Sequence, residues 1–256
     1  MNQTNRIVVT GATSGLGRAI AYQLATQHQV TIIATGRRNN RLQTLQADCK
    51  QRGGIIEPYP LDLTEPTQIK KFIEEIAATE LNGIILNAGI TVADRFENGT
   101  LEQYQQLIQT NILANLQLIH GLLQPLEKSK GSILIVASLA GLVPVPYQSV
   151  YAGSKAFMVN LGLSLREELK SKNITVSTFA PGGIATEMTD NATFESLKDK
   201  LAPAEEVAKS CIKGYLQRKA LIVPGAENKL VAFLSKLVPK TWIASIGEKI
   251  YRKTVD

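Results

Sequence analysis

The sequence predicts one large α/β domain, in which a doubly wound parallel sheet of seven strands carries helices on both faces. Two observations lead to this prediction. Short runs rich in valine and isoleucine alternate along the chain with longer segments of helical spacing. The runs at 7–9, 84–86 and 133–136 are continuously apolar, which is typical of parallel strands buried on both faces. The 256 residues are enough to bury the core of such a domain.

We expect strands and helices to alternate along the chain, which implies right-handed crossovers between parallel strands. No linker or repeat divides the chain, so we expect one domain over 1–225 and a basic amphipathic extension over 226–256. The strands are expected at 6–11, 30–36, 55–63, 83–89, 132–138, 174–182 and 220–225. The helices are expected at 15–27, 39–51, 66–79, 101–127, 151–171 and 204–218.

The composition excludes several classes of protein. Hydrophobic residues make up 44% of the chain and charged residues 20%, as in ordinary globular proteins, so extensive disorder is not expected. The two cysteines form no CxxC motif and the two histidines stand far apart, so we expect no metal site and a reducing, cytoplasmic setting. We expect neither a membrane span nor a signal peptide.

Half of the net charge lies in the last 31 residues. The whole chain carries +6, and residues 226–256 hold six basic side chains against three acidic ones. The other 225 residues hold 22 basic and 19 acidic side chains. Because the main body is so nearly balanced, it gives no reason to expect nucleic-acid binding.

A glycine-rich loop, TGATSGLG at 10–17, joins the first strand to the first helix. Glycine allows a tight turn and the close approach of a pyrophosphate, and a helix N-terminus offers free N–H groups and partial positive charge. Tight turns also use glycine, but this position between strand and helix favours a dinucleotide site. The residues expected to contact the dinucleotide here are Gly11, Thr13, Ser14, Gly15, Leu16 and Gly17.

The end of the second strand, Gly36-Arg37-Arg38, predicts which dinucleotide is bound. An acidic residue at this place holds the ribose 2′-hydroxyl of NAD, whereas an arginine favours the 2′-phosphate of NADP. No carboxylate is present, and arginine can grip a phosphate with two hydrogen bonds. The sequence therefore favours NADP(H) over NAD(H), with Arg37 as the main contact. The alternative is that both arginines are solvated residues at a helix start.

Two further strand ends are expected to contact the cofactor. Asp62, followed by Leu63, is placed to accept a hydrogen bond from the adenine amino group, and capping the next helix is the alternative role. Asn87, Ala88 and Gly89 end the fourth strand on the same edge of the sheet. Small residues there let a cofactor lie close to the backbone.

Tyr151 and Lys155 lie four residues apart at the start of a long helix, and Ser138 ends the fifth strand. The spacing puts the tyrosine and the lysine on one helix face. A lysine ammonium and an oxidised nicotinamide both favour phenolate, so we expect the pKa of Tyr151 to lie below that of an ordinary tyrosine. Such a group suits carbonyl reduction and alcohol oxidation, with Ser138 orienting the substrate oxygen. The alternative is an ordinary amphipathic helix face.

Taken together, these motifs resemble the short-chain dehydrogenase/reductases of about 250 residues. The resemblance rests on TGATSGLG, Asn87-Ala88-Gly89, Asn111, Ser138, YAGSK at 151–155 and PGGIAT at 181–186, and it spans about residues 5 to 225. It implies a Rossmann-like catalytic domain. Family members commonly pair the helices corresponding to 101–127 and 151–171, which implies a homodimer or homotetramer.

The resemblance also implies roles for single residues. Asn111, Ser138, Tyr151 and Lys155 would form a catalytic tetrad, in which Asn111 holds a water that links Lys155 to solvent. Lys155, beside Tyr151, would also bind the nicotinamide ribose. The nicotinamide carboxamide would be framed by Pro181, Gly182, Ile184 and Thr186.

The sequence departs from the family pattern at two places. At Leu86 a second asparagine commonly precedes the Asn-Ala-Gly motif, and at Ser14 NADP enzymes often carry a basic residue. The NADP(H) prediction therefore depends on the arginine pair.

Substrate contacts are expected from 139–150, which is apolar, and from 187–203, which we interpret as a lid. Tyr147 is expected either to line the pocket or to pack. The leading hypothesis is an NADP(H)-dependent oxidoreductase of a lipophilic ketone or acyl-type carbonyl. One alternative is a reductase of 3-oxoacyl thioesters on an acyl carrier protein, and another is a non-catalytic NADP(H)-binding regulator.

The extension 226–256 repeats an apolar helical face on either side of Pro239. An apolar face, a basic rim and the only tryptophan of the chain match a helix that lies on an anionic membrane, so a peripheral membrane contact is one interpretation. Packing on the core or on a second subunit are the alternatives. The residues of the face are Leu230, Phe233, Leu234, Leu237, Trp242, Ile243, Ile246 and Ile250, flanked by Lys229, Lys236, Lys240, Lys249, Arg252 and Lys253.

Overall fold

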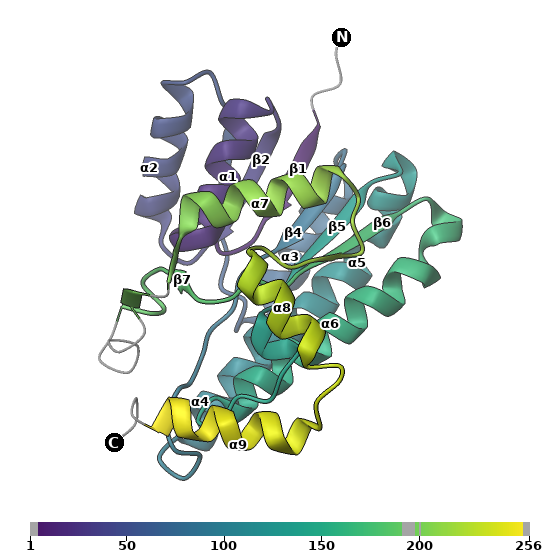
Figure 1. The fold of residues 1–256 in the computed structure, drawn as a ribbon. Helices are drawn as coiled ribbons and strands as arrows, with labels where there is room; N and C mark the ends of the chain where they lie inside the picture. The colour runs from purple at the N-terminus through teal and green to yellow at the C-terminus, as the bar shows by residue number, and fades with distance from the viewer. Residues whose placement is uncertain (1–4, 191–197, 200, 253–256) are drawn as a thin grey trace.

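The computed structural model describes residues 5–190, 198–199 and 201–252, and it confirms the seven-stranded parallel sheet. The strand order is β3-β2-β1-β4-β5-β6-β9, and every neighbouring pair is parallel (Figure 1). The order reverses between β1 and β4, the point at which doubly wound sheets bind ligands. The strands are β1 (Arg6–Val9), β2 (Thr31–Gly36), β3 (Ile56–Pro60), β4 (Gly83–Leu86), β5 (Ser132–Val136), β6 (Thr175–Phe179) and β9 (Leu221–Ile222).

Helices cover both faces of the sheet, as predicted. On one face α1 (Gly15–Gln27), α2 (Asn39–Lys50) and α7 (Ala204–Leu216) share a core cluster with Ile7 and Val9. On the other face α3 (Pro66–Ala77), α5 (Ala114–Ser129) and α6 (Ser149–Glu168) pack with Val8. Neighbouring residues of one strand therefore enter different cores, which explains why the run at 7–9 is continuously apolar.

The single helix predicted over 101–127 is wrong in its middle. The structure divides it into α4 (Leu101–Ile108), a π-helical turn η1 (Gln109–Leu113) and α5. A π turn closes its hydrogen bonds over five residues instead of four. Neither glycine nor proline occurs between 101 and 120 to indicate the break, so the spacing reads as one helix. Asn111 lies in the π turn.

Several strands end earlier than predicted. The strand expected at 83–89 stops at Leu86, and that expected at 174–182 stops at Phe179. The strand expected at 220–225 is reduced to Leu221–Ile222. A separate pair of two-residue strands, β7 (Ile184–Ala185) and β8 (Ala202–Pro203), was not predicted. Beyond the strand ends the backbone leaves the sheet, so the released residues can line a cavity.

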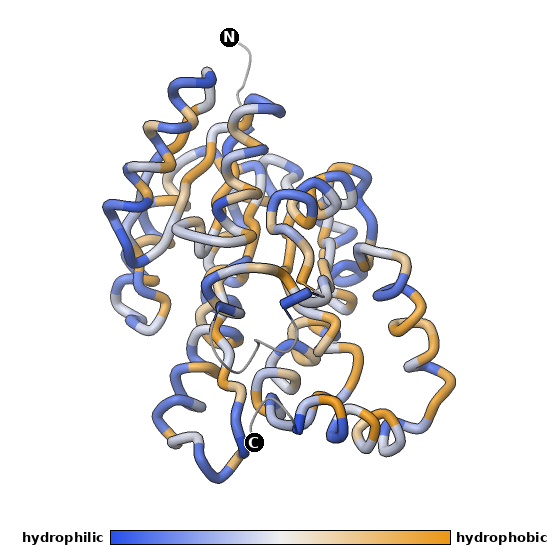
Figure 2. Tube along the Cα trace, turned by 60° about the vertical axis from the view of Figure 1, so that its left-hand side comes forward, coloured by the Kyte–Doolittle hydropathy of each residue, from blue (hydrophilic) through white to orange (hydrophobic). Residues whose placement is uncertain are grey.

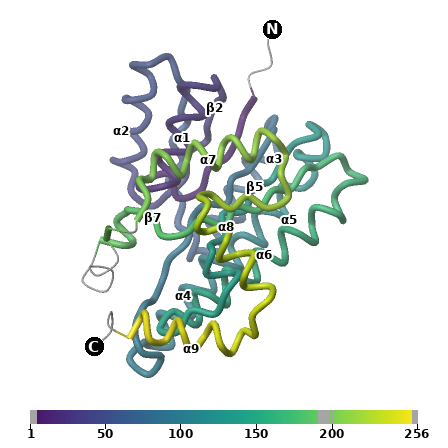
Figure 3. The backbone as a smooth tube through the Cα atoms, viewed as in Figure 1, coloured from purple at the N-terminus to yellow at the C-terminus, as the bar shows by residue number. Residues whose placement is uncertain are grey.

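Two helices follow the sheet, α8 (Ala226–Leu234) and α9 (Lys240–Tyr251). In the view of Figure 3, α9 lies at the opposite end of the molecule from the N-terminus. Neither helix contains a fully buried residue, and neither contributes to the two core clusters. In Figure 2 both helices contain orange, hydrophobic turns and lie at the periphery of the molecule. Over the described residues, no helix is long and apolar enough to cross a membrane.

Candidate active site

A cavity of about 760 Å³ lies beyond the carboxyl ends of the strands. It brings together every predicted site residue except Asn111, which lies behind its wall. The predicted residues that line it are Gly11, Thr13, Ser14, Gly15, Leu16, Gly17, Arg37, Arg38, Asp62, Leu63, Asn87, Ala88, Gly89, Ser138, Tyr151, Lys155, Pro181, Gly182, Ile184 and Thr186.

The glycine loop is tight because it packs directly against the end of β4. A Cβ on Gly17 would lie 2.3 Å from both Asn87 Nδ2 and the carbonyl oxygen of Gly11. The Asn87 side chain donates to the Thr10 carbonyl at 3.0 Å, and Thr10 Oγ1 accepts from the N–H groups of Asn87 and Ala88 at 3.0 Å each. Sequence reasoning missed Thr10, which sits inside the predicted motif and joins it to the next strand.

Helix α1 presents its N-terminus to the cavity. Ser14 is the N-cap, its side chain makes no capping hydrogen bond, and the first turn holds no acidic residue. Arg38 donates to Ser14 Oγ at 2.9 Å and to Thr13 Oγ1 at 3.3 Å. The helix end and the guanidinium together favour an anion at this place.

Glu187 joins two arginines at the same end of the cavity. Arg38 donates to Glu187 Oε2 at 2.8 Å, and Arg41 pairs with Oε1. Hydrogen bonds from Arg41 and Arg38 lower the pKa of the Glu187 carboxyl. Arg37 is exposed and lines the same region. The sequence did not predict the roles of Arg41 and Glu187, because nothing in the chain links residues so far apart.

Asp62 lines the cavity, but it also holds a turn. Its Oδ1 accepts from the N–H group of Thr64 at 2.9 Å and from the Thr64 hydroxyl at 2.8 Å. Helix α3 has Glu65 as its N-cap, so Asp62 stabilises the preceding turn and does not cap the helix.

Tyr151, Ser138 and Lys155 converge from α6 and the end of β5. The Tyr151 side chain is hydrogen-bonded to Ser138, and Lys155 Nζ lies 5.8 Å from the centroid of the Tyr151 ring. Lys155 Nζ also donates to the Val136 carbonyl at 3.0 Å. A Cβ on Gly141, in the 3₁₀ turn η2 (Leu139–Gly141), would lie 2.6 Å from the Lys155 carbonyl oxygen. Because Gly141 has no side chain, η2 and α6 can approach closely enough for Ser138 and Tyr151 to form their hydrogen bond.

Asn111 fastens the loop after β4. Its side-chain Oδ1 accepts from the N–H group of Ile90 at 2.9 Å, and its Nδ2 donates to the Ile90 carbonyl at 2.9 Å. Its main-chain carbonyl accepts from Asn115 Nδ2 at 2.8 Å. A Cβ on Gly89 would lie 3.2 Å from both Asn111 Oδ1 and Lys155 Nζ, so Asn111 borders the lysine from behind the cavity wall.

The expected lowering of the Tyr151 pKa is wrong for the protein on its own. Burial raises the pKa of Tyr151, and the hydrogen bond with Ser138 acts in the opposite direction. Burial also lowers the pKa of the Lys155 ammonium to about 8. The lysine is directed at a backbone carbonyl, and desolvation outweighs its effect on the tyrosine. A lowered tyrosine pKa would require the positive charge of an oxidised nicotinamide.

The other end of the cavity is apolar, and part of it was predicted. Val143 and Val145 line it, and Met188 and Leu201 line the cavity next to Glu187 and β8. They come from the expected segments 139–150 and 187–203, of which 191–197 and 200 lie outside the described residues.

Two tyrosines connect this end to α9. Tyr147 takes the second of its two expected roles: it does not line the cavity but packs on α9, where it donates to Glu248 Oε1 at 2.9 Å. Tyr251, also in α9, does line the cavity. In the sequence, the one signal for a contact from this part of the chain was the length of the segment that follows β9.

These residues fit a nicotinamide dinucleotide. The glycine loop leaves no room for a Cβ at Gly17, α1 offers its N-terminus, and Arg37 and Arg38 line the cavity beside that loop. Farther along the cavity, the Tyr151 side chain is hydrogen-bonded to Ser138 and lies near Lys155. Such a set can bind a cofactor and exchange a proton with a substrate oxygen.

Comparison with known proteins agrees with this geometry. The family model described as short chain dehydrogenase matches residues 5–196. The 11-beta-hydroxysteroid dehydrogenase-like 4A protein of Arabidopsis thaliana is 29% identical over 248 residues, covering 93% of this chain and 82% of the relative. The ketoacyl reductase HetN of Nostoc sp. is 30% identical over 239 residues, covering 91% and 82%.

Solved structures share the fold. A short-chain dehydrogenase from Sphingobium yanoikuyae in complex with NADPH has a TM-score of 0.82 at 24% identity, covering 91% of this chain and 94% of that one. A bulky-bulky ketone specific alcohol dehydrogenase from Comamonas testosteroni has a TM-score of 0.79 at 21% identity, covering 92% and 94%. The chain therefore belongs to the short-chain dehydrogenase/reductase family and is an NAD(P)-dependent oxidoreductase that acts on CH–OH and C=O groups.

Proposed function

We propose that the protein is an NADP(H)-dependent oxidoreductase that interconverts a lipophilic ketone or acyl-type carbonyl and the corresponding alcohol. One observation carries the proposal. A single cavity has arginines at one end, apolar side chains at the other, and Tyr151 with Ser138 and Lys155 between them.

NADPH, when bound, supplies the hydride for carbonyl reduction. Tyr151 donates its proton to the substrate oxygen, and Ser138 holds that oxygen by a hydrogen bond. Lys155, whose pKa is about 8, can return a proton to the tyrosine near neutral pH. Asn111 lies near Lys155, behind the cavity wall. By the family resemblance, Asn111 would hold the water that connects Lys155 to solvent.

We propose NADP(H) as the preferred cofactor, with Arg37 as the main contact to the 2′-phosphate. Arg38 is already engaged by Ser14 and Glu187, whereas Arg37 is exposed beside the cavity. The NADPH complex of the Sphingobium relative supports this preference. We assign the adenine to the wall at Asp62 and Leu63, and the carboxamide to the segment from Pro181 to Thr186.

A second candidate is a 3-oxoacyl-thioester reductase, which the relative named ketoacyl reductase favours. An acidic carrier protein would need exposed basic residues for docking. The basic residues that could serve are Lys128, Lys130, Arg166 and Lys170, of which Arg166 donates to the carbonyls of Val176 and Arg218. A non-catalytic regulator is the weakest of the three, because the protein retains Tyr151 and Lys155 in contact with the cavity.

We further propose a cytoplasmic homodimer or homotetramer with one catalytic domain over 1–225, and an extension over 226–256 that makes a peripheral membrane contact. Leu113, Phe157 and Leu163 support the oligomer, since these exposed apolar side chains lie on the helices that the family pairs.

The test is turnover by the full chain with a panel of ketones, aldehydes, 3-oxoacyl thioesters and steroids, followed by NADPH absorbance with NADH as control. We expect lipophilic ketones to turn over fastest. Tyr151→Phe should lower kcat about 1,000-fold and leave NADPH affinity nearly unchanged. Full activity of this variant would refute the proton-donor role of Tyr151.

A further inference from the structure

Six large apolar side chains of α8, of α9 and of the turn between them are exposed. Their exposed fractions lie between 51% and 69%, far more than those of core residues of an amphipathic helix. We name this region the α8–α9 surface, and it comprises Leu230, Phe233, Leu237, Trp242, Ile246 and Ile250.

The side of α9 that faces the domain carries partly buried residues of mixed kind, namely Ile243, Ala244, Gly247, Glu248 and Tyr251. Gly247 packs against Pro146, where an added Cβ would lie 3.1 Å from Pro146 Cδ. Glu248 accepts from the Tyr147 hydroxyl at 2.9 Å. A helix that served only the core would turn its large apolar residues inward. The α8–α9 surface is therefore built to be covered by something outside the domain.

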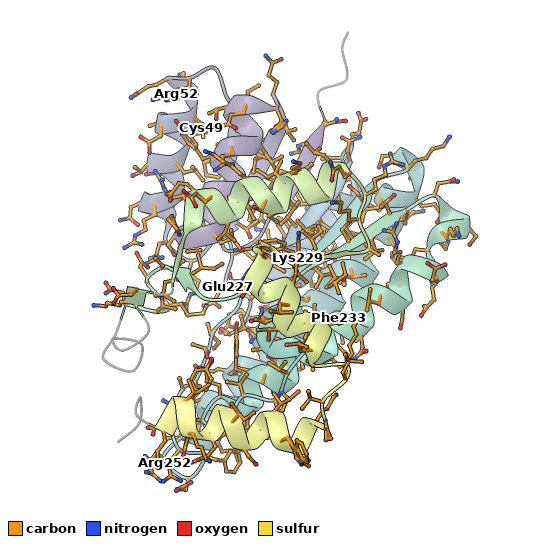
Figure 4. All side chains as sticks on the ribbon, viewed as in Figure 1. Cys49, Arg52, Glu227, Lys229, Phe233 and Arg252 are labelled. Atoms are coloured by element: carbon orange, nitrogen blue, oxygen red, sulfur yellow. The ribbon has the colours of Figure 1, made fainter. Side chains whose placement is uncertain are left out.

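Basic residues surround this surface. Lys229, Lys236, Lys240, Lys249 and Arg252 are all exposed on or beside the two helices. Figure 4 labels Lys229 and Phe233 on α8 and Arg252 at the end of α9. The acidic residues among the described part of these helices are Glu227 and Glu248, and Glu248 is held by Tyr147 and Arg252. The rim therefore holds five basic side chains against two acidic ones and remains positive, although Arg252 and Glu248 form an ion pair.

The positive charge of the rim distinguishes between two partners that could cover an apolar surface. A second copy of the chain would bring an identical basic rim against the first, and like charges would repel. An anionic bilayer offers hydrocarbon to the apolar side chains and negative headgroups to the lysines. An exposed tryptophan, as at Trp242, is also typical of helices that lie in a membrane interface.

We propose that the α8–α9 surface docks the enzyme on an anionic lipid bilayer, with α9 lying between the membrane and the substrate end of the cavity. Tyr251 of α9 lines that cavity, and α9 is joined to the substrate loop through Glu248 and Tyr147. A lipophilic carbonyl dissolved in the bilayer would enter the cavity beside α9. This second part rests on the proposed function, whereas the docking does not.

The docking is measured directly because Trp242 is the only tryptophan in the chain. The full chain, without cofactor or substrate, is mixed with vesicles of phosphatidylcholine alone or with 30% phosphatidylserine added. We expect a blue shift of the tryptophan emission and co-sedimentation with the anionic vesicles, and at least tenfold weaker binding to the neutral ones. No shift and no co-sedimentation with either vesicle would overturn the proposal.

Two variants that keep Trp242 test which residues bind. Leu237→Ser/Ile246→Ser removes apolar contact, and Lys240→Glu/Lys249→Glu reverses the rim; each should weaken anionic-vesicle binding at least tenfold. The matched controls alter exposed residues elsewhere: Ile55→Ser/Leu216→Ser, and Lys209→Glu/Lys213→Glu in α7. The controls should bind as the wild type does. Equal loss in controls and test variants would contradict a specific surface.

Size-exclusion chromatography and kinetics distinguish the remaining outcomes. If Leu237→Ser/Ile246→Ser changed the oligomeric state and not vesicle binding, the surface would pair with a second copy and the proposal would fall. With a water-soluble ketone we expect this variant to keep wild-type activity. With a lipophilic ketone supplied in anionic vesicles, its apparent KM should rise at least fivefold. Vesicle binding by an inactive wild type would refute the proposed function and leave the docking intact.

Discussion

The two ends of the cavity are built from different kinds of structure. The cofactor end is formed by strand ends of the seven-stranded sheet and by the first turn of α1. The substrate end is formed by the segment after β5 and by α9, which joins neither core cluster, and the segment after β7 runs from the arginines towards it. The first is fixed by backbone packing, whereas the second is fixed by a few side-chain contacts. Mutations should therefore have large effects on stability and cofactor affinity at the cofactor end, and small effects on activity at the substrate end.

The largest effect is expected at the cofactor end from Gly17→Ala. Its Cβ would overlap Asn87 Nδ2 and the Gly11 carbonyl at 2.3 Å, so the loop and the end of β4 must separate. We expect NADPH affinity to fall about 100-fold and stability to fall by about 1–3 kcal/mol, measured by fluorescence titration and urea unfolding. Gly153→Ala is the matched control, because no atom lies within 4 Å of its added Cβ. Wild-type affinity in Gly17→Ala would show that the loop is not rigid.

Lys155 lies where the two ends meet, and its burial should destabilise the fold. Its pKa is about 8 in the folded protein against 10.5 for the unperturbed group, so the unfolded state binds the extra proton between pH 8 and 10.5. Stability due to this group therefore rises with pH across that window, by about 3 kcal/mol in total. Lys155→Met should be inactive but more stable than the wild type at pH 7, and this advantage should shrink towards pH 10.5. Urea unfolding across the window measures it.

The exposed Lys209 in α7 supplies the control for this comparison. Lys209→Met removes a lysine from the protein surface, so it measures the effect of losing a lysine side chain outside the cavity. A stability difference for Lys155→Met that does not change with pH would show that Lys155 is not desolvated.

The smallest effect is expected at the substrate end from Tyr147→Phe. The variant loses the hydrogen bond to Glu248 that joins α9 to the substrate loop, and a single bond of this kind contributes about 1 kcal/mol. We expect kcat/KM for a lipophilic ketone to fall about threefold while NADPH affinity stays constant. Tyr59→Phe, which loses a hydrogen bond to Glu75 between β3 and α3, should change neither. A change in NADPH affinity in Tyr147→Phe would mean that the two ends are coupled.

The difference between the two ends also explains what the sequence could predict. The cofactor end depends on short-range rules, since a glycine loop between a strand and a helix has one place in a doubly wound sheet. All of its predicted residues do line the cavity. The YxxxK spacing likewise placed Tyr151 and Lys155 together, because four residues make about one helical turn.

Contacts between distant parts of the chain were not predictable in this way. Tyr251 enters the cavity wall only because α9 folds back on the substrate loop, and Glu187 meets Arg38 across 149 positions of sequence. The pKa of Tyr151 was predicted in the wrong direction because spacing shows which groups are neighbours but not how deeply they are buried. Burial is a property of the whole fold.

The π turn η1 has a consequence for insertions and deletions. It accommodates one residue more than an α-helical turn would hold, and α4 and α5 continue on either side of it. Removing one residue from Gln109–Leu113 would close this turn into a regular helix, and because the turn already absorbs the extra residue, Leu118 and Leu122 of α5 would keep their buried face. The turn itself would change, and with it the position of Asn111, whose side chain holds the backbone of Ile90. The length of this segment, and not only the identity of Asn111, is therefore constrained.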